Sequence, residues 1–158
     1  MSDTIAAIAT PIGEGGLTII RFSGTDSLSV ALKLFYTPSG KSIKKLSPNK
    51  AHFGSIYEPT TRKCVDEVVL TWFKNPKSYT GEDVVEISAH GGTFVSSRIL
   101  ELVLDHGARL AEPGEFTRRA FMNGRIDLSQ AEAVADLISA ASDKALQAAI
   151  MQLKGRLS

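Results

Sequence analysis

Short apolar runs separated by polar breaks fill the first two thirds of the chain, and the pattern predicts a succession of strands and helices. Strands are expected at residues 5–9, 17–22, 52–57, 65–73 and 84–90, because each is a short apolar run bounded by turn residues. Helices are expected after Asp26 and after Gly91, where apolar residues recur at intervals of three and four. Strands and helices do not alternate regularly, so the order favours an α+β domain with a mixed β-sheet.

Each predicted helix is expected to turn one apolar side inward. In the first helix this side carries Leu28, Ala31, Leu32 and Phe35, and in the second Phe94, Val95, Ile99, Leu102 and Val103. Residues 37–50 follow the first helix and contain two prolines, a glycine and the lysines Lys41, Lys44, Lys45 and Lys50. This composition is typical of an exposed connection.

The last part of the chain predicts one long helix, from residue 128 to about residue 157. Asp127 is a good N-cap, and Gln130 can complete a capping box with it. A helix of roughly 28 residues is about 42 Å long at 1.5 Å per residue. A small neighbouring domain cannot cover its whole apolar face, so a second copy of the chain or residues beyond its end must do so. We therefore place the end of the α+β domain near residue 120 and expect the chain to be truncated.

Composition narrows the class of protein. The 158 residues include 18 basic and 17 acidic ones, for a formal net charge of +1, and 43% of them are hydrophobic. These values argue against a long disordered tail and against a nucleic-acid coat protein, without excluding a local basic patch. The single cysteine, Cys64, forms neither an intramolecular disulfide nor a thiolate zinc site. No apolar run reaches the ~18 residues of a transmembrane helix, and no basic signal segment opens the chain, so we expect a cytoplasmic protein.

Two glycine motifs look like nucleotide-binding sites but lack the right context. Residues 40–42 read Gly-Lys-Ser, yet Phe35 stands where a P-loop requires its first glycine. Residues 13–16, Gly-Glu-Gly-Gly, lie between two predicted strands, which disfavours a dinucleotide fingerprint and leaves either a tight turn or close approach to a ligand. The histidines have no metal-like spacing and no serine lies in a nucleophile elbow, so metal-dependent and nucleophilic hydrolases are poorly supported.

Two charged residues in the predicted strands are candidate binding groups. A period of two places Glu86 on the face opposite Val85 and Ile87. Glu86 is then either a solvent-facing acid or a partly buried carboxylate that accepts a planar two-donor edge, such as a guanidinium or a 2-aminopyrimidinone ring. From this residue alone the solvent-facing acid is favoured. Arg21 follows the apolar run that ends at Ile20, and it either extends to water or binds an anion or carbonyl.

Residues 112–128 carry the densest group of charges. A short helix is expected from residue 114 to residue 122, with Phe116, Ala120 and Phe121 inward, and Gly124 is expected to end it. A corner between two domains explains the turn. It does not explain the three arginines that gather there, Arg118, Arg119 and Arg125.

This corner resembles the signature of the bacterial tRNA modification GTPase family MnmE, also called TrmE. The signature covers residues 113–128 and continues as Gln-Ala-Glu-Ala at residues 130–133. Further matching blocks follow in family order at residues 3–7 with 10–11, 15–16 with 20–24, and 78–86 with 90–92. The blocks span almost the whole chain, and the least similar stretch is residues 37–65.

The resemblance implies an N-terminal α+β domain related to tetrahydrofolate-binding domains of one-carbon enzymes, at residues 1–120, and the start of a helical domain at residues 121–158. In the family this N-terminal domain forms a homodimer and binds formyl-tetrahydrofolate near the dimer interface. Arg21, Glu86 and Arg125 match the family's folate-contacting positions. Glu86 would accept the amino and ring N–H groups of the pterin, and the two arginines would hold carbonyl or carboxylate oxygens. Arg125 replaces a lysine found in many relatives, which keeps the charge but not the shape.

The resemblance also implies a role for the complete protein. The family couples GTP hydrolysis, with magnesium and potassium in its GTPase domain, to adding a carboxymethylaminomethyl-type group at the wobble uridine of certain tRNAs. Its partner is the FAD protein MnmG, in a heterotetramer. These residues contain no P-loop and lack the family's C-terminal cysteine motif, so we expect no catalytic residue or metal site in this chain. The alternatives are a purely structural dimerisation domain without a working folate site and, less well supported, tRNA binding by Lys41, Lys44, Lys45, Arg118 and Arg119.

Overall fold

The computed structural model of the protein describes residues 3–9 and 16–157, and the glycine motif at residues 13–16 lies outside them except for Gly16. The elements in chain order are β1 (Ile5–Ile8), β2 (Thr18–Ser23), α1 (Ser27–Leu34), β3 (Phe35–Tyr36), β4 (Ala51–Tyr57), β5 (Cys64–Phe73), β6 (Val84–Ala89), α2 (Gly92–Asp105), β7 (Arg109–Leu110), α3 (Glu115–Met122) and α4 (Leu128–Leu157). The five predicted strands and the predicted helices are all present, and the two-residue strands β3 and β7 are additional.

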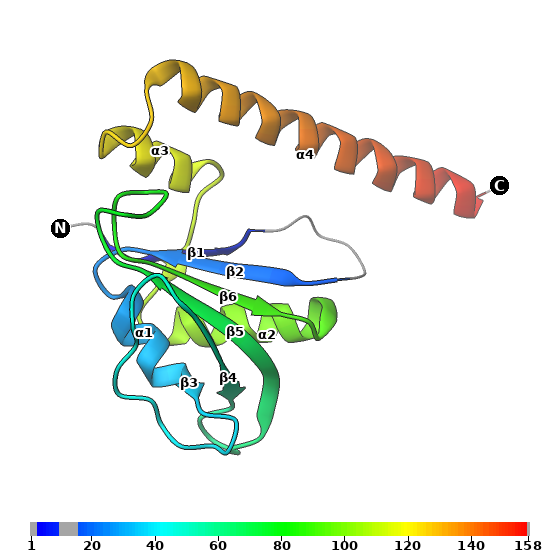
Figure 1. Ribbon diagram of the computed structural model, residues 1–158. Coiled ribbons are helices and arrows are strands. Elements are labelled where there is room, and N and C mark those ends of the chain that lie inside the picture. Colours follow the sequence, from blue (N-terminus) through cyan, green and yellow to red (C-terminus); the bar gives the residue numbers. More distant parts are fainter. Residues whose placement is uncertain (1–2, 10–15, 158) are drawn as a thin grey trace.

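The strands form one mixed sheet in the order β3-β4-β5-β6-β2-β1-β7. The β1–β7 pair is parallel, and the other neighbours are antiparallel. Helices α1 and α2 cover one face of the sheet, and α3 and α4 lie on the other side (Figure 1). The α+β prediction is therefore confirmed, with a long C-terminal helix added to it.

Strand register decides which side chains enter the core. Ile20, Ile87 and Leu70 are direct neighbours across β2, β6 and β5, and none of them is exposed to solvent. The next row of the register carries Arg21 opposite Glu86, on the other face of the sheet. This division confirms the predicted period of two in β6. It also explains why two charged residues can lie in central strands without entering the core.

Three details of the helix prediction were wrong. Phe35 was expected in the first helix, but α1 ends at Leu34 and Phe35 pairs with Ile56 in the sheet. Phe94 was expected to face inward and is 83% exposed, because it lies two residues before the buried Ser96 and therefore on the opposite side of α2.

For helix α3 the predicted inward face is confirmed at Ala120, which is 0% exposed, and wrong at Phe121. Its buried residues are Glu115, Thr117 and Ala120, whereas Phe121 is 40% exposed. Phe116 turns toward the sheet residue Arg21. The apolar pattern alone missed this arrangement because the buried side of α3 is held by charged and polar contacts, described below.

The corner between α3 and α4 is fixed by two standard helix-end motifs. Gly124, at φ +72°, donates its N–H to Phe121 O, and Arg125 N–H donates to Ala120 O, which together form a Schellman motif. Asp127 and Gln130 then exchange side-chain-to-backbone bonds of 2.9 and 2.7 Å. The predicted capping box is confirmed.

Helix α4 leaves most of its apolar side chains uncovered. Leu137, Leu146 and Met151 are 69%, 61% and 73% exposed. The prediction that this chain alone does not cover the helix is confirmed for its described side chains. No helix in the described ranges is long and apolar enough to cross a membrane.

Close packing of β4 against β3 gives a test of the fold. A methyl group at Gly54 would lie 2.5 Å from Phe35 Cζ and would also meet the backbone oxygen of Tyr36. Because neither group can move without disturbing the sheet, we expect Gly54→Ala to lower the free energy of unfolding by about 2 kcal/mol or more. Urea titration followed by circular dichroism measures this. In Gly155→Ala the added methyl group meets no atom within 4 Å, so the free energy of unfolding should not fall. Equal stability of the two variants would contradict the β3–β4 packing.

Candidate functional site

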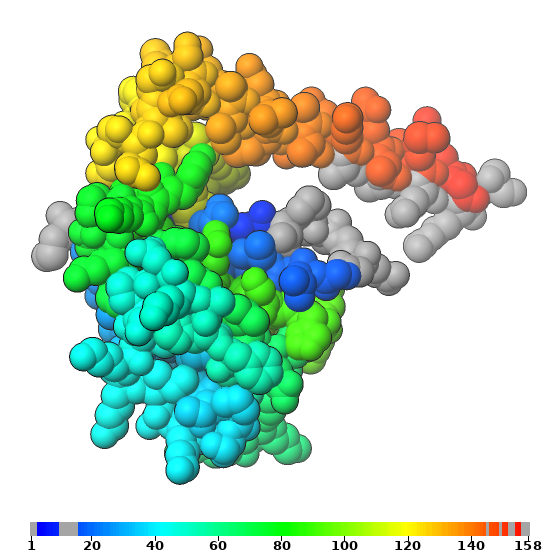
Figure 2. Space-filling view, in the orientation of Figure 1, coloured from blue at the N-terminus to red at the C-terminus, as the bar shows by residue number. Residues whose placement is uncertain are grey.

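A cleft of about 470 Å³ lies where α3 and the first turns of α4 stand over β1 and β2. The sheet contributes Ala7, Ile8 and Arg21, the helices contribute Phe116, Thr117, Val134 and Ile138, and the segment before β6 contributes Tyr79. Figure 2 shows α4 extending away from the body of the molecule beyond this region. The volume is in the range of small-molecule sites, and the lining is mainly apolar with few polar groups.

Arg21 is the cation of the cleft, and its position is fixed from three sides. Its Nε and Nη2 both donate to Glu86 Oε2, at 2.8 and 2.7 Å. Its guanidinium carbon lies 5.8 Å from the ring centre of Tyr79 and 5.7 Å from that of Phe116. Aromatic faces attract cations at these distances. The guanidinium is therefore held between two rings and a carboxylate, with the side chain 27% exposed.

Glu86 is a partly buried carboxylate that binds a planar two-donor edge. Its side chain is 25% exposed, and the edge belongs to Arg21, which lies directly opposite in the β2–β6 register. The reading favoured from this residue alone, a solvent-facing acid, was therefore wrong. Both arginine donors converge on Oε2, and no described residue donates to Oε1.

Of the three residues predicted for the folate site, Arg21 lines the cleft, Glu86 is joined to it through its ion pair with Arg21, and Arg125 is not among the lining residues. Its side chain is exposed, and its Nε donates to Ser78 O at 3.0 Å. The next residue, Tyr79, shares a hydrogen bond of 2.9 Å between its hydroxyl and Thr117 Oγ1. Within this chain, Arg125 thus reaches the cleft only through the segment that carries Tyr79.

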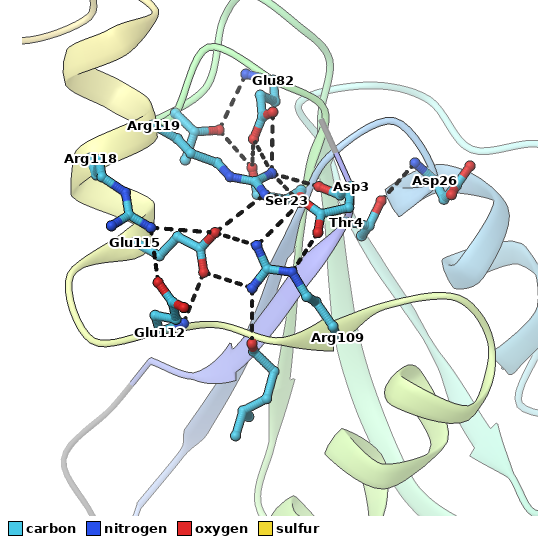
Figure 3. Close-up of polar contacts among 12 residues, drawn as sticks. Asp3, Thr4, Ser23, Asp26, Glu82, Arg109, Glu112, Glu115, Arg118 and Arg119 are labelled. Carbon is cyan, nitrogen blue, oxygen red and sulfur yellow. Dashed lines mark hydrogen bonds and ion pairs between the residues drawn. The ribbon is translucent and has the colours of Figure 1, made fainter. Parts of the chain in front are cut away.

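Beneath α3 lies a group of ion pairs built around the carboxylate of Glu115 (Figure 3). The Glu115 side chain is 4% exposed. Arg109 of β7 donates to both of its oxygens, from Nη1 at 2.9 Å and from Nη2 at 2.5 Å, and Glu112 N–H donates to Oε1 at 2.9 Å. A buried charge is retained only when it is paired and hydrogen-bonded in this way.

Arg119 extends the same group of ion pairs to the N-terminal residues. It donates to Asp3 O and to Asp3 Oδ1, each at 2.6 Å, and lies 3.1 Å from Glu82 Oε1. It also lies 3.4 Å from Glu115 Oε2. Helix α3 is therefore fastened to the segment before β1, to β7 and to the segment before β6.

These contacts lower the pKa of both Glu115 and Asp3. The hydrogen bonds from Arg109 lower the pKa of Glu115 to about 2, against the opposing effect of burial, and the Glu112 N–H and the charge on Arg119 add to the lowering. Arg109 and Arg119 also lower the pKa of Asp3. In turn, Glu115 and Asp3 raise the pKa of Arg109.

Sequence reasoning found some parts of this site and missed others. It named Arg21 and Glu86, and it noted the charge at Arg118 and Arg119 without their partners. It missed Tyr79 as the ring over Arg21, and it missed the burial of Glu115. The four-residue spacing of Glu115 and Arg119 was the available signal, since such pairs meet on one side of a helix. Nothing local signals the contact between Arg119 and Asp3, which are 116 residues apart.

Comparisons with known proteins show which family the chain resembles. The family described as GTP-binding protein TrmE N-terminus matches residues 4–125. A protein named tRNA modification GTPase MnmE, from Geobacillus thermodenitrificans, is 54% identical over 156 residues, which are 99% of this chain and 34% of that protein. Proteins with the same name from Lysinibacillus sphaericus and Streptococcus pneumoniae are 53% identical over the same shares. The chain thus spans about a third of the length of the curated relatives it matches.

The lowered pKa of Glu115 predicts how stability depends on pH. A carboxylate with a folded pKa of about 2 and an ordinary value of 4.5 stabilises the fold fully above pH 4.5, and this contribution is lost as the pH falls through 2. At pH 7 we expect Glu115→Gln to lower the free energy of unfolding by about 2–3 kcal/mol. This difference should shrink as the pH falls toward 2, which urea titrations at several pH values measure.

Glu132→Gln is the matched control, because Glu132 is an exposed glutamate on α4. Its stability should follow that of the unchanged protein across the same pH range. A constant difference between Glu115→Gln and the unchanged protein from pH 7 to the lowest pH would contradict the role assigned to the Glu115 carboxylate.

Proposed function

The chain belongs to the TrmE N-terminus family of GTP-binding proteins, and on this premise we propose that it is the formyl-tetrahydrofolate-binding and dimerising module of a tRNA modification GTPase. The observation that carries the proposal is the guanidinium of Arg21, which lines the cleft, lies between the rings of Tyr79 and Phe116 and pairs with Glu86 of the neighbouring strand. The cleft, and not the chain as a whole, is the site that this proposal concerns.

The chemistry of the cleft residues fits a pterin. A pterin is flat, and its amino group and neighbouring ring N–H form a planar two-donor edge. The guanidinium of Arg21 has an edge of the same kind, and Glu86 accepts it. A carboxylate has several acceptor positions, and no described donor occupies Glu86 Oε1. The rings of Tyr79 and Phe116 provide flat apolar surfaces on which a conjugated ring can stack.

Each residue then has a distinct part in binding. Glu86 would accept the N–H groups of the pterin, and Arg21 would hold carbonyl or carboxylate oxygens of the folate. Arg125 is the third residue that we propose for the site. Because its guanidinium bonds Ser78 O, its contribution within one chain is to hold the segment that places Tyr79 over Arg21. Formyl-tetrahydrofolate carries a one-carbon unit, and these residues bind and orient it.

For the complete protein, we extend the proposal to the activity of the family. Its relatives are named tRNA modification GTPases. The GTPase domain, with GTP, magnesium and potassium, would lie outside this chain. With the FAD protein MnmG, the complete cytoplasmic protein would modify the wobble uridine of certain tRNAs. The present chain would contribute the folate site and homodimer contacts and no catalytic residue.

The alternative function is assembly alone, without folate binding. The exposed apolar residues of α4 favour it, and so do Leu17, just before β2, and Phe53 of β4, which are 63% and 59% exposed. Exposed apolar patches are typical of surfaces that contact other proteins. Both functions predict a homodimer in sedimentation velocity. Only the first predicts that the dimer binds formyl-tetrahydrofolate.

Isothermal titration calorimetry with formyl-tetrahydrofolate tests the folate proposal. We expect saturable binding to the unchanged chain. We expect Glu86→Gln to weaken this binding by about tenfold or more, because a hydrogen bond to a charged acceptor is worth about 1.5–3 kcal/mol. In the Glu86→Gln variant, the pterin N–H groups would face a side-chain amide whose own NH2 group is a donor.

Glu67→Gln is the matched control, since Glu67 is an exposed glutamate on the neighbouring strand β5. It should bind formyl-tetrahydrofolate like the unchanged chain. Absence of binding in a sample shown to be dimeric would overturn the folate proposal and leave the assembly function. Equal weakening by both variants would show that Glu86 has no specific part.

A further inference from the structure

The near-zero net charge of the chain conceals a strongly basic segment. Residues 27–57 contain five lysines and neither aspartate nor glutamate, so this stretch carries +5. The remaining residues, with 13 basic and 17 acidic side chains, carry −4. Asymmetry of this size within one domain is an electrostatic signature of an anionic partner.

Four of these lysines lie on the connection between β3 and β4, and all four are exposed: Lys41, Lys44, Lys45 and Lys50. We call residues 41–50, which carry these lysines, the lysine segment. The ion pairs among the described residues all use arginine or histidine as the cation, so no described acid neutralises these four lysines. The segment, in cyan, projects at the end of the molecule away from α4 (Figure 2).

The backbone of the lysine segment is held in place at both ends and in the middle. Near its start, Lys41 N–H donates to Thr37 Oγ1 at 3.0 Å, and Ser42 pairs with Tyr36. Leu46 enters the core and is 5% exposed. Near the end, Asn49 N–H donates to Trp72 O at 2.8 Å. The lysines are therefore displayed on a preformed surface, and binding does not first have to order a loose loop.

The chemistry of the segment favours RNA over a membrane or a protein. Its apolar residues, Ile43 and Leu46, pack against the core, so the segment offers nothing to insert into a bilayer. Protein interfaces are depleted in lysine. Lysine ammonium groups are compact point charges, and they suit contacts with backbone phosphates that do not depend on base sequence.

We propose that the lysine segment binds the phosphate backbone of a folded RNA, with tRNA as the partner that the named activity of the relatives supplies. The surface is separate from the cleft, and it does not depend on folate binding. It also differs from the basic surface considered from the sequence, which included Arg118 and Arg119. In the structure both of these arginines are already paired with acids. Arg119 is committed to Asp3 and Glu82, and Arg118 pairs with Glu112.

Fluorescence anisotropy with a labelled tRNA transcript tests the proposal on the full 158-residue chain. Four phosphate contacts predict that the logarithm of the binding constant falls with the logarithm of salt concentration with a slope of about −3 to −4. Replacing all four lysines of the segment by glutamine should remove most of this slope. It should also lower the affinity at least about tenfold at 100 mM salt. Replacing the same four by arginine should retain binding, because the charge is kept.

The matched control replaces four other exposed lysines by glutamine, at Lys63, Lys74, Lys77 and Lys144. It changes the net charge equally and should retain most of the affinity. The proposal is overturned if the unchanged chain does not bind the transcript at low salt, or if the segment variant binds like the unchanged chain. Equal losses in the two glutamine variants would also overturn it, by reducing the effect to net charge. Vesicles of phosphatidylcholine and phosphatidylserine in equal parts should not bind, and segment-dependent vesicle binding without RNA binding would assign the surface to a membrane instead.

Discussion

The buried carboxylate of Glu115 is the contact on which the placement of α3 depends. Burying a charge is costly, and this one is kept because Arg109, Arg119 and a backbone N–H surround it. Those partners come from β7, from the connection that follows it and from α3 itself, and Arg119 also binds Asp3 near the start of the chain. Helix α3 is thereby fixed over β1 and β2, where Phe116 reaches Arg21. Without that fixed position the cleft would lose one of its walls.

Local sequence signals predicted the parts of the structure that local interactions decide. The period of two around Glu86, the capping box of Asp127 and Gln130, and the long uncovered helix α4 are all present. The signals failed where distant segments decide the outcome. Nothing within β2 shows that Arg21 meets a carboxylate 65 residues away, and a two-residue strand such as β7 has no pattern of its own. The domain boundary near residue 120 and the folate roles of Arg21, Glu86 and Arg125 stay predictions.

The two kinds of cation in this protein are used differently. The arginines with ion pairs hold the fold and the cleft, because a guanidinium can bond several oxygens at once in a fixed geometry. The lysines of the segment between β3 and β4 pair with no described acid and remain available to phosphate. On our proposals, the folate cleft and the RNA surface are separate regions that share no residue. Folate could then bind whether or not RNA is present.

The most direct test of the proposed cleft is the nitrogen-15 NMR signal of the Arg21 Nε–H group, assigned by its loss in Arg21→Lys. This N–H donates to Glu86, so a pterin that binds Glu86 must change its surroundings. Saturating formyl-tetrahydrofolate should shift the Arg21 signal and leave that of Arg98 unchanged. Arg98 lies on α2, its Nε donates to Glu58, and neither residue lines the cleft. An Arg21 signal that stays in place at saturation, or that moves no more than the Arg98 signal, would contradict the assignment of the cleft as the folate site.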